Sequence, residues 1–87
     1  MKEFIYKIND PMGLHARPAT NLVKIAGTYE SQITIKRNAT QKTANLKRIL
    51  SVMSLSVLQG EEITISISGK DETPAYDELQ SFCQANL

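Results

Sequence analysis

Two stretches of alternating residues constrain the fold of this chain most strongly. Residues 31–37 read SQITIKR and residues 61–68 read EEITISIS, so isoleucine alternates with polar side chains in both. Successive side chains of a β-strand point to opposite faces, and this period is therefore typical of strands that are buried on one face only. Both stretches favour an antiparallel sheet with one covered face and one face in water.

Two further stretches can join this sheet. FIYKI at residues 4–8 is short and rich in residues that favour strands, and it is followed by Asn9-Asp10-Pro11, a polar cluster with a turn-favouring proline. KTAN at residues 42–45 can pair as a short strand. We therefore predict four antiparallel strands, with a loop after the first.

The remaining segments favour helices. Residues 46–57, LKRILSVMSLSV, lack a clean alternation, and here we expect a short helix followed by a loop. Thr73-Pro74 resembles an N-cap followed by proline at the first position of a last helix. One helix, ending near Gly27, has an apolar face formed by Ala19, Leu22, Val23 and Ala26, and the last helix has one formed by Tyr76, Leu79, Phe82 and Cys83.

The predicted order is β-α-β-β-α-β-α. Consecutive antiparallel strands covered by helices on one face hide the isoleucines and leave the Ser, Thr and Lys side chains in water. We therefore predict an α+β fold, an open-faced two-layer sandwich with a four-stranded antiparallel sheet covered on one face by three helices. The 87 residues fit one small domain, residues 1–87.

Composition excludes several classes of protein. Ten basic and nine acidic residues give a net charge of +1, and the Phe and Tyr residues are scattered, which argues against a nucleic-acid-binding protein. No apolar run reaches the roughly 20 residues of a membrane span, and no signal peptide is recognisable, so we expect a cytoplasmic protein without membrane contact. Cys83 is the only cysteine, which suits a reducing compartment and excludes an intrachain disulfide.

The only histidine, His15, lies just ahead of the first predicted helix, in GLHARPA at residues 13–19. The free N–H groups and the dipole of a helix start favour anions such as phosphate. Arg17 can hold phosphoryl oxygens with two parallel hydrogen bonds, and Pro18 suits the first turn. These positive surroundings favour a neutral imidazole, whose lone pair can attack phosphorus.

A simpler interpretation is that His15 only caps the helix and that Arg17 is a solvated charge. Local physics alone favours this second interpretation, because one histidine cannot form a catalytic triad or a metal cluster.

A family resemblance changes this balance. GLHARPATNLV, together with LKRILSVMSLSVLQGEEITISISGKDE, resembles the histidine-containing phosphocarriers (HPr) of the bacterial sugar phosphotransferase system, over essentially the whole chain. The resemblance implies that Nδ1 of His15 accepts a phosphoryl group from enzyme I and passes it to the IIA unit of a sugar transporter. Arg17 would assist transfer, and Ala16 and Pro18 would shape the helix entry. It also implies a carrier without cofactor or metal, which is a substrate of its partners and not an enzyme.

The resemblance further implies a docking surface beside the phosphorylation site. We expect Leu50 and Met53 to contact partners, whereas Leu55, and one of these two, could equally be core. Three cations could surround this patch and attract acidic partners. They are Lys24, Lys47 and Arg48. The chain is expected to act as a monomer.

Arg48 is a departure from many family members. In them a regulatory serine follows the lysine of the NLK stretch, whereas here Arg48 follows Lys47. Ser51 and Ser54 are close by, but nothing in the sequence marks either as a substrate of HPr kinase. An alternative function is therefore that of a regulatory paralogue, acting by protein docking or in a nitrogen-type phosphorelay. The retained His15 favours phosphotransfer.

Overall fold

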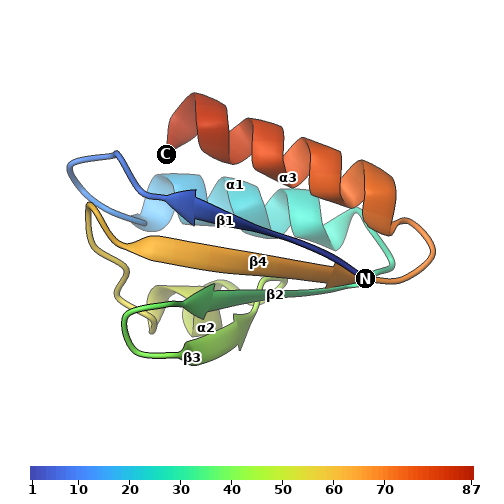
Figure 1. Cartoon of the computed structure of the whole chain (residues 1–87), viewed down its shortest axis with the longest axis horizontal. Coiled ribbons are helices and arrows are strands. Elements are labelled where there is room, and N and C mark those ends of the chain that lie inside the picture. Colours follow the sequence, from blue (N-terminus) through green and yellow to red (C-terminus); the bar gives the residue numbers. More distant parts are fainter.

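The computed structural model describes residues 1–87 and shows the seven predicted elements in the predicted order (Figure 1). They are β1 (Lys2–Lys7), α1 (Ala16–Gly27), β2 (Gln32–Arg37), β3 (Lys42–Asn45), α2 (Ile49–Met53), β4 (Glu62–Ser68) and α3 (Glu72–Asn86). No helix combines the length and the apolar character that crossing a membrane requires.

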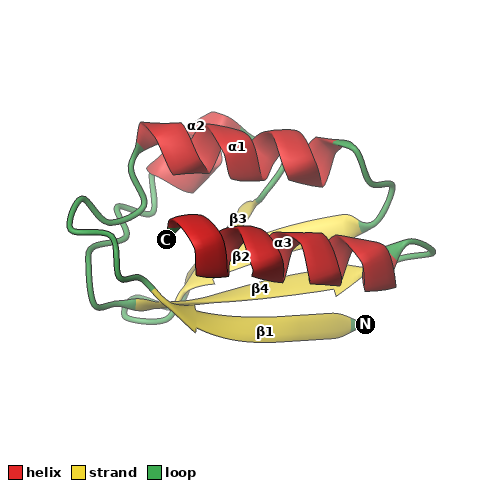
Figure 2. Ribbon diagram, turned by 90° about the horizontal axis from the view of Figure 1, so that it is seen from above, coloured by secondary structure: helices red, strands yellow, loops and turns green.

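The four strands form one antiparallel sheet in the order β1-β4-β2-β3. The last strand in sequence, β4, therefore lies between β1 and β2, and Ile65 at its middle is opposite Phe4 on one side and Ile35 on the other. Figure 2 shows all three helices on one side of the sheet and the other side uncovered. The predicted open-faced α+β sandwich is confirmed.

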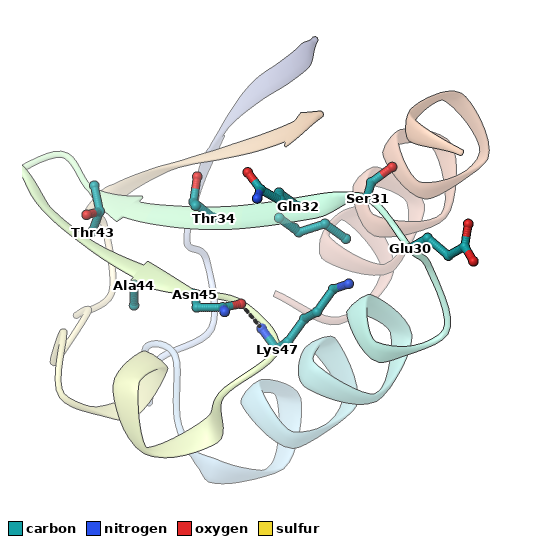
Figure 3. Close-up of a pocket in the computed structure, with 9 residues that line it drawn as sticks. Glu30, Ser31, Gln32, Thr34, Thr43, Ala44, Asn45 and Lys47 are labelled. Atoms are coloured by element: carbon teal, nitrogen blue, oxygen red, sulfur yellow. Dashed lines mark hydrogen bonds between the residues drawn. The ribbon is translucent and has the colours of Figure 1, made fainter. Parts of the chain in front are cut away.

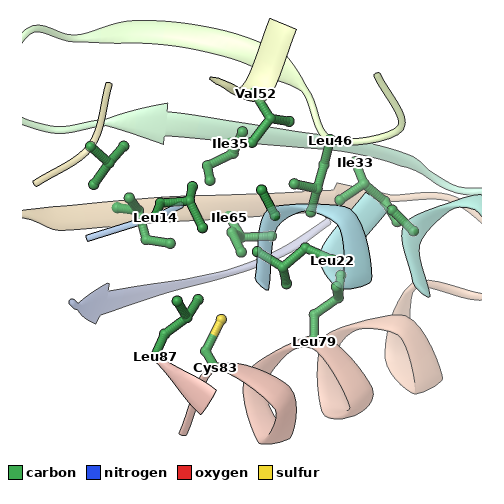
Figure 4. Packing of buried hydrophobic residues seen from close by; sticks show 14 of the residues in the cluster. Leu14, Leu22, Ile33, Ile35, Leu46, Val52, Ile65, Leu79, Cys83 and Leu87 are labelled. Carbon is green, nitrogen blue, oxygen red and sulfur yellow. The ribbon is translucent and has the colours of Figure 1, made fainter. Parts of the chain in front are cut away.

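The alternation in β2 and β4 has the predicted structural meaning. Their isoleucines are buried against the helices, and Thr34 and Ser68 lie exposed on the open face. Thr64 is an exception, because its side chain on the open face is buried and donates its hydroxyl to Asn38 at 2.8 Å. Burying each such large apolar side chain contributes about 1.5–3 kcal/mol to folding. Figure 4 shows how the strands and helices share one core, which includes Leu14, Leu22, Ile33, Ile35, Leu46, Val52, Ile65, Leu79, Cys83 and Leu87.

The two long helices bury the faces that the sequence predicts, with small differences. Val23 on α1 and the aromatic rings of Tyr76 and Phe82 on α3 are only partly buried, at the edge of the core. Ala75, which the sequence analysis left out, is completely buried. The fully buried residues on the two helices are Ala19, Leu22, Ala26, Ala75, Leu79 and Cys83.

The predicted start of α3 is wrong by two residues. The helix begins at Glu72 after Asp71, so Thr73 is not the N-cap and Pro74 is the third helical residue. Proline fits there because the first-turn N–H groups have no intrahelical partner to lose. Side-chain contacts fix the earlier start, because Glu72 accepts the N–H of Gly69 and Asp71 accepts N–H groups of the segment before β2.

Candidate functional site

His15 lies at the junction between the loop after β1 and helix α1. It is the N-cap residue, with extended backbone angles (φ −86°, ψ 179°), and its side chain makes no capping hydrogen bond. The interpretation that this ring only caps the helix is therefore wrong. Arg17 is helical although Pro18 follows it, because both belong to the first turn, where proline is tolerated.

The loop in front of His15 is held by a close backbone contact at Gly13. This glycine has a positive φ of 67°, and a Cβ at this position would lie 2.4 Å from the carbonyl oxygen of Val57. The next residue, Leu14, is buried and donates its N–H to the same oxygen at 3.1 Å. Only glycine fits here, and the segment after α2 thereby fixes the position of His15.

The end of α3 fixes the other side of the loop. The carbonyl oxygen of Leu87 accepts the N–H groups of Asn9 and Asp10, at 2.6 and 2.8 Å. The side chain of Leu87 is itself buried in the core. Asp10 lies five residues before His15, and its backbone is thus bound to the last residue of the sequence.

Asp10 is the residue at this site that the sequence analysis missed. Its Oδ2 lies 3.1 Å from Nε2 of His15, and its Oδ1 accepts the N–H of Met12 at 2.9 Å. The Met12 N–H, and then the His15 ring, lower the pKa of the Asp10 carboxyl below its ordinary value. His15 therefore faces a carboxylate as well as the positive helix start, and its surroundings are not only positive as the sequence suggested.

The first turn of α1 offers free hydrogen-bond donors. Its first intrahelical bond runs from the N–H of Ala19 to the carbonyl oxygen of His15, and the N–H groups of Ala16 and Arg17 have no partner in the chain. Arg17 is exposed and makes no ion pair, and no acidic residue occupies the turn. Two amides and one guanidinium are thus available to an anion next to His15.

The structure separates the apolar residues that were predicted to dock partners. Leu50 is 83% exposed, Met53 is partly buried against the core, and Leu55 is buried. Two more exposed apolar side chains, Met12 and Leu58, were not singled out from the sequence. Both belong to segments that meet at Gly13, so they lie in the loops that hold His15.

Two of the three predicted docking cations, Lys24 and Lys47, have their charges toward the other end of α1. Lys24 is in the last turn of α1, and Nζ of Lys47 donates to the carbonyl oxygen of Tyr29, just beyond that helix, at 2.7 Å. Arg48 is exposed and is the N-cap of α2. Because a 12-residue helix rises about 18 Å, the charges of Lys24 and Lys47 are not in the immediate surroundings of His15.

The two candidate regulatory serines lie on and just after α2. Ser54 donates its hydroxyl to the carbonyl oxygen of Ser51 at 2.6 Å, whereas Ser51 is partly buried within the helix. Arg48, the residue at which the sequence departs from the resemblance, is the N-cap of α2.

The largest concavity, about 410 Å³, is shown in Figure 3, and His15 is not among the residues that line it. It lies between the start of β2, the edge strand β3 and Lys47, whose Nζ is held by Tyr29 as described above. Its lining is mostly polar and consists of Glu30, Ser31, Gln32, Ile33, Thr34, Thr43, Ala44, Asn45 and Lys47. His15 is instead reached from an open surface.

Comparison with known proteins gives a consistent result. Residues 2–85 match the family model described as "PTS HPr component phosphorylation site". The chain is 42% identical over 79 residues to the phosphocarrier protein HPr of Lysinibacillus sphaericus, covering 91% of this chain and 88% of that protein.

Solved structures agree. HPr-C-His from Thermoanaerobacter tengcongensis superposes with a TM-score of 0.90 at 38% identity, covering 98% of this chain and 93% of that one. Crh, the catabolite repression HPr of Bacillus subtilis, superposes with a TM-score of 0.69 at 30% identity, covering 99% and 100%.

Proposed function

This chain belongs to the HPr family of phosphotransferase-system phosphocarriers, and from that premise we propose that His15 accepts a phosphoryl group from enzyme I and passes it to the IIA unit of a sugar transporter. The observation that carries the proposal is the composition of the helix start. A reachable imidazole adjoins two unpartnered backbone N–H groups and the unpaired guanidinium of Arg17. This set of groups suits the binding of a phosphoryl group attached to the ring.

In the proposed step the Nδ1 lone pair of His15 forms a bond to phosphorus. The bond between phosphorus and the leaving atom of the phosphorylated donor breaks, and that atom takes the electron pair. The three equatorial oxygens carry spread negative charge, which the N–H groups of Ala16 and Arg17 and the Arg17 side chain stabilise. Transfer to the acceptor reverses these changes, and the ring regains its lone pair.

The open position of His15 suits a carrier better than a catalyst. Phosphoryl transfer needs mainly correct positioning and neutralisation of charge, which a partner protein supplies when it covers the site. His15 is 27% exposed in the free chain, and its site has no enclosed cavity. We therefore propose that the chain is a substrate of its partners.

The retained histidine also bears on the regulatory alternative. Crh-type structures share the fold of this chain, so the fold alone does not separate a carrier from a regulator. A protein that signalled only by docking would have no need for a nucleophilic ring beside free anion-binding groups. His15 therefore favours phosphotransfer, whichever transporter or regulator receives the phosphoryl group.

The proposal is tested by phosphorylation with enzyme I and phosphoenolpyruvate, followed by mass measurement. We expect one phosphoryl group that is labile in acid and stable in alkali, because protonation of the ring assists cleavage of an N–P bond. His15→Ala should abolish the label, whereas Asn21→Ala, an exposed substitution on the same helix, should retain it. A label that survives acid, or that persists in His15→Ala, would refute the proposal.

A further inference from the structure

The carboxylate of Asp10 holds a fixed place against the ring of His15. We propose that Asp10 is a positioning residue that selects the His15 tautomer with its proton on Nε2, so that the lone pair is on Nδ1. The use of that lone pair in phosphoryl transfer rests on the proposed function, whereas the tautomer itself rests on the geometry of this chain.

The geometry leaves the neutral ring one arrangement. An ionised carboxylate only accepts hydrogen bonds, so the contact of 3.1 Å between Oδ2 and Nε2 requires a proton on Nε2. A neutral imidazole carries one N–H, and Nδ1 must then be bare. The other oxygen, Oδ1, is already bonded to the N–H of Met12 at 2.9 Å, which fixes the orientation of the carboxylate.

Asp10 is also held in its ionised form and in place. The N–H of Met12 and the ring lower the pKa of its carboxyl, so Asp10 remains an acceptor at neutral pH. Its own backbone N–H is bonded to Leu87 and its carbonyl oxygen accepts the N–H of Gly13, at 2.8 Å in both cases. The backbone bonds hold Asp10 in the loop, and a carboxylate that turned away from His15 would lose its bond to the N–H of Met12.

The same contact assists transfer through charge. When Nδ1 has bonded to phosphorus while Nε2 keeps its proton, the ring carries a positive charge, and the adjacent carboxylate stabilises it. The proton stays on Nε2 and is not transferred to Asp10. The buried carboxylate of a Ser-His-Asp triad likewise stabilises the charged imidazole without taking its proton. When the phosphoryl group leaves, the electron pair returns to Nδ1 and the starting tautomer is restored.

Asp10→Asn gives a direct test because an amide has only one acceptor oxygen. If that oxygen stays on the N–H of Met12, the amide NH2 faces Nε2 and requires Nε2 to accept. In the reverse orientation the NH2 group would face the N–H of Met12. Both groups are donors, so no hydrogen bond would form between them. We therefore expect the substitution to move the ring proton from Nε2 to Nδ1.

The measurement is ¹⁵N NMR of the imidazole, in a buffer alkaline enough for the ring to be neutral. His15 is the only histidine, so its two ring signals need no further assignment of residue. In the parent we expect Nδ1 to give the downfield signal of a bare nitrogen and Nε2 that of an N–H. In Asp10→Asn we expect the reverse assignment, with the proton on Nδ1 and Nε2 bare. Asp10→Ala should show a mixture of the two tautomers, and Asp77→Asn, an exposed control, should show the signals of the parent.

Phosphorylation by enzyme I gives the second arm. For Asp10→Asn we expect kcat/KM to fall by roughly tenfold to a hundredfold, since an imidazole in the wrong tautomer lacks the attacking lone pair. The inference would be overturned if the ring proton of Asp10→Asn stayed on Nε2. It would also be overturned if the proton moved to Nδ1 and the rate of phosphorylation did not change. Failure of the parent chain to become phosphorylated would refute the proposed function, and the NMR result would still decide the tautomer.

Discussion

At the scale of single residues, Arg17 is the side chain that separates transfer from folding. It is exposed and makes no ion pair, so its removal costs the folded state little. We predict that Arg17→Glu lowers the phosphorylation rate by roughly a hundredfold, because it replaces a donor to the phosphoryl oxygens by a like charge. Stopped-flow mixing with enzyme I measures the rate. Thermal unfolding should show no loss of melting temperature, because a glutamate in the first turn of α1 suits the positive helix start.

Two controls sharpen this prediction. Lys42→Glu on the edge strand β3 makes the same charge reversal at an exposed position and should leave the rate unchanged at physiological salt. Arg17→Lys keeps the charge but loses the planar pair of donors, so its rate should lie between those of parent and Arg17→Glu. Equal rates in the parent and in Arg17→Glu would show that Arg17 has no role in transfer and is only a solvated charge.

The residue scale also shows where sequence analysis succeeded and where it stopped. His15 stands out locally as a lone histidine before a helix pattern, but local physics alone favours a capping role, and its assignment to phosphotransfer comes from the family resemblance. Asp10 was not found, since its meaning depends on a turn that brings it back to His15 and on the carbonyl oxygen of Leu87. A polar residue in a turn cluster is ordinarily read as part of the turn.

At the scale of elements, α2 is the least self-sufficient part of the fold. It has five helical residues, its N-cap Arg48 makes no side-chain capping bond, and its first turn has no acidic residue. A helix this short is held mainly by packing, here through the buried Val52. Its start is therefore sensitive to a change of capping residue.

We predict that Arg48→Asp stabilises the chain while slowing its phosphorylation. An aspartate cap accepts an N–H of the first turn and suits the positive helix end, which together are typically worth about 0.5–1 kcal/mol at an exposed site. Urea unfolding measures this gain. Arg48→Asn is the matched control, because asparagine caps equally well without the negative charge.

The effect of Arg48→Asp on transfer should depend on salt. Arg48 is an exposed charge at the start of α2, and such charges act over a Debye length of about 30 Å at 0.01 M but only about 8 Å at 0.15 M. We expect slower association with enzyme I at low salt and nearly parental rates at physiological salt. Parental rates at low salt would place Arg48 outside the docking surface.

At the scale of the whole molecule, the fold was predictable because the strands have a clear sequence pattern. Isoleucine alternation fixed which face of β2 and β4 is buried, and with it the layer order. The start of α3 was not predictable, since Thr73-Pro74 is a good local signal that long-range contacts override. Asp71 accepts hydrogen bonds from Glu30 and Ser31, which lie 41 and 40 positions earlier in the chain, and the Glu72 side chain accepts the N–H of Gly69.

This connection also carries part of the acid sensitivity of the molecule. The carboxylate of Asp71 accepts the N–H of Glu30 at 2.8 Å, the N–H of Ser31 at 3.0 Å and the hydroxyl of Ser31, and it thereby joins the start of α3 to the start of β2. The Ser31 hydroxyl, and then the Glu30 N–H, lower the pKa of Asp71 below its ordinary 3.8. A carboxyl whose pKa is lowered by folding stabilises the folded state above its unfolded pKa, and this stabilisation is lost as the pH falls toward the folded pKa.

We predict that Asp71→Asn lowers the melting temperature by several degrees at neutral pH, because one of its two acceptor oxygens becomes a donor that faces the N–H of Glu30 or Ser31. The amide does not titrate, so the difference from the parent should shrink as the pH falls from about 5 to about 2. The variant curve should still slope, since other carboxyls with a lowered pKa remain, among them Glu61 beside Arg37. Asp77→Asn, at an exposed position of α3, should follow the parent throughout. Parallel curves for parent and Asp71→Asn across the acid range would show that the ionisation of Asp71 is not linked to folding, and that its contacts with the segment before β2 contribute equally when it is protonated.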